Sequence, residues 1–60
     1  SEQTMREKLA YWTVQLRQER HLRRKALAQQ APHQVSYHRQ REGVMMETIT
    51  ALKSAMANKH

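Results

Sequence analysis

The sequence predicts an all-α fold: an antiparallel helical hairpin of two long amphipathic helices, completed by dimerisation into a four-helix bundle or by helices of a partner. Apolar residues recur at steps of three and four on both sides of the only proline, which places them on one helix face. A chain reversal at this proline brings the two apolar stripes together. Because a domain of 60 residues buries only about 60% of its unfolded surface, we expect further helices to cover the remainder.

The first helix is predicted over about residues 4–30. The segment Thr4-Met5-Arg6-Glu7 has the form of a capping box, in which a hydroxyl and a glutamate satisfy the first backbone N–H groups. No helix breaker follows before Pro32, and the composition is strongly helix-forming. The apolar stripe of this helix consists of Met5, Leu9, Trp12 and Leu16.

The turn is predicted over about residues 29–35 and the second helix over about residues 33–57. Pro32 lacks a backbone N–H, so it ends the first helix or occupies the first turn of the second, where the missing donor is harmless. The second stripe consists of Val35, His38, Glu42, Met45, Ile49, Leu52 and Met56. Gly43 lies within this helix, either as a tolerated glycine or as a point where another helix approaches closely.

The pairing of the two helices follows from the position of the turn. A reversal at residues 29–32 places opposite each other residues whose numbers sum to about 65, such as Leu16 with Ile49 and Leu27 with His38. The residues expected to form the interface between helices are Met5, Leu9, Trp12, Leu16, Leu27, Val35, Met45, Ile49, Leu52 and Met56.

Charged residues enter the predicted interface near the turn. In the same register Arg23 falls opposite Glu42, and Glu19 falls near Met45. A partly buried ion pair contributes little net stability, but it penalises wrong registers by leaving a charge unpaired. We therefore expect Arg23 and Glu42 to set the register. The alternative is that the hairpin splays here and these groups are solvated.

Catalytic and metal chemistry find little support in the sequence. There is no cysteine and no aspartate, and no serine or threonine is placed beside a histidine and a carboxylate as a nucleophile requires. His38 and Glu42 are four residues apart, as two metal ligands on one helix would be, but two ligands make a weak site. We expect no enzymatic activity, no metal and no cofactor.

The net charge of +6 favours acidic partners. On the first helix four arginines share a sector of about 60° beside the apolar stripe, and these are Arg6, Arg17, Arg20 and Arg24. Arginine suits phosphate and carboxylate oxygens, so nucleic acid and an acidic protein surface are candidate partners; the alternative is a merely solvated face. Tyr11 and Leu22 form a second apolar set, on which another hairpin could pack.

The sequence therefore predicts a non-enzymatic interaction and assembly module, which self-associates as a homodimer or docks onto helices of a larger partner. The alternative is a basic nucleic-acid-binding regulator that uses the arginine ridge. No apolar stretch approaches the roughly 18 residues of a membrane span, and the residues before the first predicted helix have no signal-peptide pattern. We expect an intracellular, soluble protein, with the cytoplasm and the nucleus equally compatible.

Overall fold

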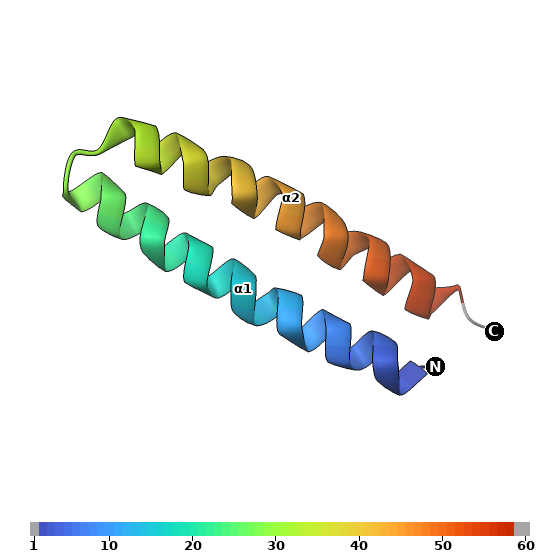
Figure 1. Cartoon of the computed structure of the whole chain (residues 1–60). Helices are drawn as coiled ribbons and strands as arrows, with labels where there is room; N and C mark the ends of the chain where they lie inside the picture. The colour runs from blue at the N-terminus through green and yellow to red at the C-terminus, as the bar shows by residue number, and fades with distance from the viewer. Residues whose placement is uncertain (1, 59–60) are drawn as a thin grey trace.

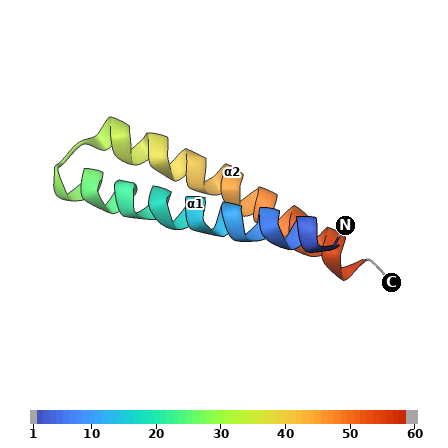
Figure 2. The same cartoon turned by 60° about the horizontal axis from the view of Figure 1, so that its bottom comes forward.

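The computed structural model describes residues 2–58 and consists of two helices, α1 (Glu2–Ala28) and α2 (Pro32–Ala57). The helices run antiparallel and side by side, with the turn at one end and both ends of the chain at the other (Figure 1). The Cα atoms span 47 × 14 × 10 Å, as expected for one layer of two helices. In the turned view of Figure 2 the helices stand apart near the turn and overlap toward the open end. The predicted antiparallel hairpin is confirmed.

The first helix begins and ends about two residues earlier than predicted. Thr4 lies inside α1, which already includes Glu2, so Thr4 is not the N-cap that the capping box would require. At the other end the helix stops at Ala28 rather than near residue 30. Residues 29 and 30 belong to the turn because the helix cannot continue through Gln30, whose backbone is left-handed.

The turn is a Schellman motif without glycine. Gln30 adopts a left-handed conformation with φ of 56°. Its N–H donates to the carbonyl of Leu27 at 3.1 Å, and the N–H of Ala31 donates to the carbonyl of Ala26 at 3.0 Å. These two bonds satisfy carbonyls that would otherwise be left open at the helix end. The chain thus reverses within three residues, fewer than the predicted turn of residues 29–35.

The second helix starts directly at the proline. Pro32 occupies its first turn, where no backbone donor is needed. The preceding Ala31 makes no side-chain cap, but its carbonyl accepts the N–H of Val35 at 3.0 Å. Gly43 is exposed in α2, and an added Cβ would meet nothing within 4 Å. Within this hairpin, Gly43 is therefore a tolerated glycine.

The row of residues by which each helix faces the other is here called the seam. Leu16, Met45 and Ile49 are buried in it, with Leu9 and Trp12 packed against them. The expected interface residues that are half-buried are Met5, Leu9, Trp12, Val35, Leu52 and Met56.

Leu27 was expected in the seam opposite His38, and this is wrong, since Leu27 is 60% exposed. Ala26 is buried in its place, with an exposure of 3%. The reason is the spacing of the seam, which alternates between four and three residues. Continued past Leu16, this alternation passes through Glu19 and Arg23 and reaches Ala26, whereas Leu27 falls on the flank.

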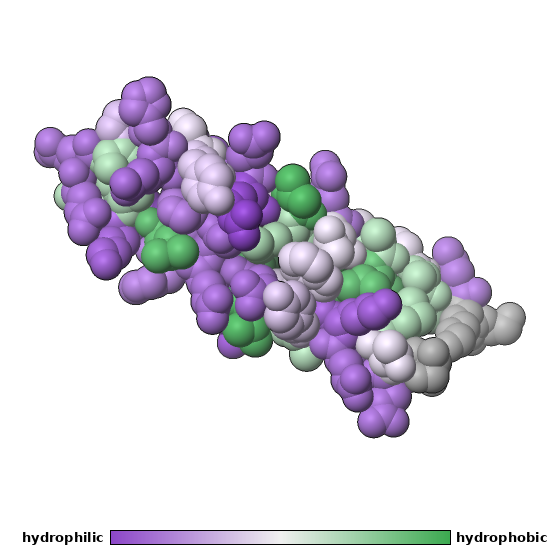
Figure 3. All heavy atoms as spheres, in the orientation of Figure 1, coloured by the Kyte–Doolittle hydropathy of each residue, from purple (hydrophilic) through white to green (hydrophobic). Residues whose placement is uncertain are grey.

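The seam has an apolar half toward the open end and a polar half toward the turn. On the face shown in Figure 3, hydrophobic surface gathers around the open half, and hydrophilic surface covers much of the turn half. Among the described residues no large side chain is less than 2% exposed. Two helices by themselves thus leave even the best-buried residues near water.

Candidate functional site

Two glutamates occupy the polar half of the seam, here called the polar layer together with their partners. Glu19 of α1 and Glu42 of α2 are each only 7% exposed. Each is bound by basic side chains of the opposite helix: Glu19 by His38 and Arg41, and Glu42 by Arg20 and Arg23. The two carboxylates therefore join the helices in a reciprocal way.

Glu19 is held by two charge-assisted contacts. The Arg41 Nε donates to Oε1 at 2.6 Å, and the His38 Nδ1 lies 2.6 Å from Oε2. Burial raises the pKa of Glu19, but the hydrogen bonds from Arg41 and His38 outweigh burial and leave this pKa below its ordinary value. The same hydrogen bond raises the pKa of Arg41. Glu19 is thus bound as a carboxylate.

Glu42 accepts from Arg23, whose Nε lies 2.5 Å from Oε2, and Arg20 approaches its other oxygen at 3.6 Å. The Arg23–Glu42 contact is the one expected from the sequence. The alternative of a splayed hairpin with solvated charges is wrong, because both carboxylates are buried and no buried side-chain N or O atom among the described residues lacks a hydrogen-bond partner.

The contacts also correct the predicted register. Glu19 was expected near Met45 and His38 opposite Leu27, but Glu19 and His38 bind each other. The four ionic contacts of the polar layer join residues whose numbers sum to between 57 and 65, and all except Arg23–Glu42 fall below the predicted 65. The compact turn accounts for the difference, since it places the reversal at Gln30.

The polar layer distinguishes this register from its neighbours. If α2 slid by one heptad in either direction, Glu19 would face Ile49 or Val35, and Glu42 would face Ala26 or Trp12. A buried carboxylate beside an apolar residue has lost its counter-charge, which costs several kcal/mol. The role of Arg23 and Glu42 in setting the register remains a prediction. We extend this prediction to Glu19 and its partners His38 and Arg41.

The flanks of the two helices form the two broad faces of the hairpin, and one of them is apolar. We call it the tyrosine face and define it by its exposed apolar residues Tyr11, Leu22, Tyr37 and Val44. All four lie on the side of the seam to which Arg41 belongs. Tyr11 and Leu22 are 11 residues, or three turns, apart on α1, and Tyr37 and Val44 are seven residues apart on α2. Tyr37 and Val44 were not singled out in the sequence, although their spacing of seven residues was the available signal.

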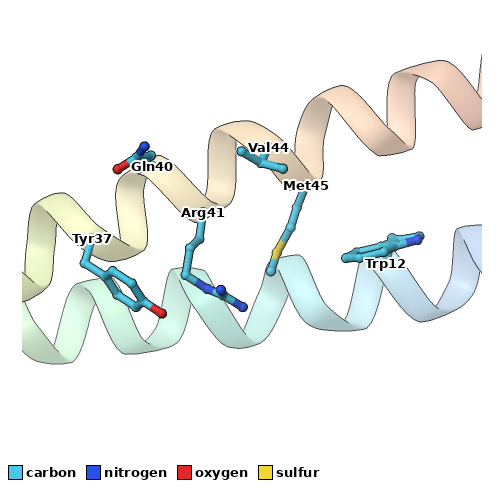
Figure 4. Close-up of a pocket in the computed structure, with 6 residues that line it drawn as sticks. All are labelled: Trp12, Tyr37, Gln40, Arg41, Val44 and Met45. Atoms are coloured by element: carbon cyan, nitrogen blue, oxygen red, sulfur yellow. The ribbon is translucent and has the colours of Figure 1, made fainter.

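A groove of about 420 Å³ lies on the tyrosine face, lined by Trp12, Tyr37, Gln40, Arg41, Val44 and Met45. In Figure 4 Tyr37 and Arg41 reach from α2 toward α1, and Met45 points between the helices. The Arg41 guanidinium lies 5.6 Å from the Tyr37 ring centroid, within cation–π range. Trp12 meets Tyr11 edge to face, with ring centroids 5.3 Å apart. The groove is thus walled by aromatic rings.

The opposite broad face is cationic. We call it the arginine face, and its charged residues are Arg6, Arg17, Arg20, Arg24, Arg39 and Lys53. The four arginines predicted from the sequence lie on α1, and α2 adds Arg39 and Lys53 to the same side of the seam. Arg20 shares Glu42 with Arg23. Within residues 2–58, Arg17 and Arg24 are exposed and form no ion pair.

The described part of the chain contains neither a group of metal-binding side chains nor a membrane-spanning helix. No three histidine or carboxylate side chains among the described residues are grouped so that they could hold a metal ion. His38 and Glu42, the pair with metal-ligand spacing, bind different partners on α1. Across the described residues, neither helix is long and apolar enough to cross a membrane.

Comparison with protein-family models, with curated proteins and with solved structures finds no match to this chain. Its function must therefore be argued from its own residues.

Proposed function

We propose that this chain is a non-enzymatic assembly module, whose two-helix layer is completed by a second copy packed on the tyrosine face. The observation that carries the proposal is the distribution of apolar surface. Among the described residues only four apolar side chains are buried, whereas the four that define the tyrosine face are 40–59% exposed. Exposed apolar residues gathered in one patch mark interaction sites, unlike single ones scattered over a surface.

The size of the face suits a second copy. A footprint of 47 by 14 Å corresponds to about 660 Å² per copy. Two such faces in contact cover about 1,300 Å², within the roughly 1,200–2,000 Å² of specific interfaces. The resulting arrangement is a four-helix bundle of two layers, a geometry that long helices with short connections favour.

The distribution of charge also favours contact through this face. Each chain carries a net charge of +6, so two copies repel each other at long range. Among the residues with described side chains, the tyrosine face bears only Lys8, Lys25 and Arg41 as charged residues, and Arg41 is paired with Glu19. The described residues of the arginine face include six cations, of which Arg20 is paired with Glu42. Two copies thus meet with the least repulsion through their tyrosine faces, and their arginine faces then point outward.

Sedimentation equilibrium on the intact chain tests the proposal, with circular dichroism to monitor helix content. The perturbation is Val44→Arg, which places a charge beside the groove. The matched control is Val14→Arg, because Val14 is comparably exposed (47% against 59%) and lies on the outer side of α1. We expect a wild-type dimer, a dissociation constant at least tenfold higher for Val44→Arg, and a change below twofold for Val14→Arg.

Three results would overturn the proposal. A stably helical wild-type monomer at all concentrations would mean that the hairpin needs no second layer. A poorly helical monomer would assign the missing helices to another protein. Equal weakening by both variants would place the contact elsewhere than on the tyrosine face.

A further inference from the structure

The cations of the arginine face have no role in the proposed self-association. Among the described residues, six cations from both helices lie on this face, so a single copy of the chain is enough to form it. The acidic residues with described side chains lie elsewhere: Glu19 and Glu42 are buried in the polar layer, and Glu7 and Glu47 are on the outer sides of the helices. Among the residues with described side chains, the face therefore carries cations and no exposed carboxylate, and its Arg20 contacts the buried Glu42.

We propose that the arginine face binds the phosphate backbone of a nucleic-acid duplex, independently of base sequence. Arg17, Arg20 and Arg24 lie within seven residues of one another, or about 10 Å along the helix axis at 1.5 Å per residue. A duplex carries one phosphate per about 3.4 Å of its axis on each strand, so its phosphates are more closely spaced along the axis than these arginines are along the helix. Arg39 and Lys53 extend the contact onto α2.

The residue types select phosphate among the anionic partners. Five of the six cations are arginines, whose planar guanidinium binds phosphate oxygens through two parallel hydrogen bonds. Leu27 and Met46 are the large exposed apolar residues on this face, which is little surface for insertion between lipid chains. An acidic helix would present scattered carboxylates to this row of cations, which runs about 27 Å from Arg6 to Arg24 at 1.5 Å per residue. A duplex carries phosphates along that whole length.

No aromatic ring lies on the arginine face among the described residues, and this favours a duplex over a single strand as its ligand. Proteins that bind single strands stack bases on aromatic side chains. The described aromatic residues Tyr11, Trp12 and Tyr37 all belong to the tyrosine face or its border with the seam. Without a stacking surface, the arginine face contacts only the backbone, and such contacts position a protein without reading sequence.

Fluorescence anisotropy with a labelled DNA duplex tests the proposal between 50 and 200 mM salt. The perturbation is the double variant Arg17→Gln, Arg24→Gln. The charge-matched control is Lys8→Gln, Lys25→Gln, which removes two charges from the tyrosine face. We expect the arginine-face variant to bind at least tenfold more weakly at 100 mM salt. Its slope of log affinity against log salt should fall by about 1.8, because each lost phosphate contact removes about 0.9.

The control variant should retain the wild-type slope to within half a unit. Equal losses in both variants would reduce the effect to net charge and overturn the proposal, as would no wild-type binding at 50 mM salt. Tighter binding to phosphatidylserine vesicles or to a polyglutamate peptide than to the duplex would assign the face to a different partner. Sedimentation of each variant in the same buffer separates this result from a failure of self-association.

Discussion

The two partners of the Arg23–Glu42 pair should respond to substitution with opposite signs. Glu42 is nearly buried and accepts from Arg23 at 2.5 Å. Replacing Arg23 by Met keeps an apolar stem of similar length but leaves the carboxylate with Arg20, which is 3.6 Å away. Loss of a charged hydrogen bond costs about 1.5–3 kcal/mol. Because Arg20 compensates in part, we expect a loss of about 2 kcal/mol in the free energy of unfolding.

Replacing Glu42 by Leu removes the buried charge itself. Arg23 and Arg20 then lose an acceptor, but their side chains are 25% and 42% exposed and can turn to water. Replacing a buried ionic group by a hydrophobic one of similar volume is often neutral or stabilising. We expect the free energy of unfolding to stay unchanged or to rise by about 1–2 kcal/mol, while the penalty against wrong registers is lost.

Urea denaturation followed by circular dichroism, at one fixed protein concentration, measures both changes. The matched control is Arg24→Met, since Arg24 is exposed and forms no ion pair within residues 2–58; such surface changes stay within about 0.5 kcal/mol. The reasoning fails if Arg23→Met and Arg24→Met have equal effects. It also fails if Glu42→Leu costs more than 2 kcal/mol.

Three further predictions concern the turn residue Gln30, Gly43 in α2, and the loss of stability at acidic pH. Gln30→Gly should raise the free energy of unfolding by about 1 kcal/mol in a urea titration, because a left-handed backbone costs a non-glycine residue about 1–2 kcal/mol. Gly43→Ala should also stabilise by about 1 kcal/mol, since its Cβ meets open space; a loss would show that another helix covers this position. The lowered pKa of Glu19 gives a contribution to stability that is present above its ordinary value of 4.5 and is lost as pH falls through the lower folded value. The melting temperature of wild type should therefore fall more between pH 5 and pH 3 than that of Glu19→Gln.

The helices were predictable because their signals are local. The apolar spacing around Leu9, Trp12 and Leu16 and the single proline are enough to predict two helices and a reversal. Likewise, Glu42 lies on the predicted stripe of the second helix, and Arg23 falls opposite it in the predicted register, so their contact could be proposed before the structure. The arginines of α1 recur on one flank and identify most of the arginine face.

The register and the turn-proximal seam were not predictable in the same way. The seam continues through Glu19, Arg23 and Ala26, a row of charged and small residues that a search for large apolar residues passes over. Its larger neighbour Leu27 is therefore predicted to be buried in the seam, whereas the structure buries Ala26. A glycine at residue 30 would have indicated the compact turn. This position instead holds Gln30, a residue type that rarely adopts the left-handed backbone found here.

The two proposed surfaces together lead to a result that neither gives alone. If two hairpins pack through their tyrosine faces, their arginine faces lie on opposite sides of the bundle, so one dimer can hold two duplexes. Donor-labelled and acceptor-labelled DNA duplexes mixed with the wild-type chain should then show energy transfer, at protein concentrations where sedimentation finds a dimer. Val44→Arg should bind duplex through the intact arginine face but abolish the energy transfer, whereas Val14→Arg should retain both. Energy transfer that persists in a monomeric Val44→Arg would mean that one hairpin bridges duplexes by itself, and the back-to-back arrangement would be wrong.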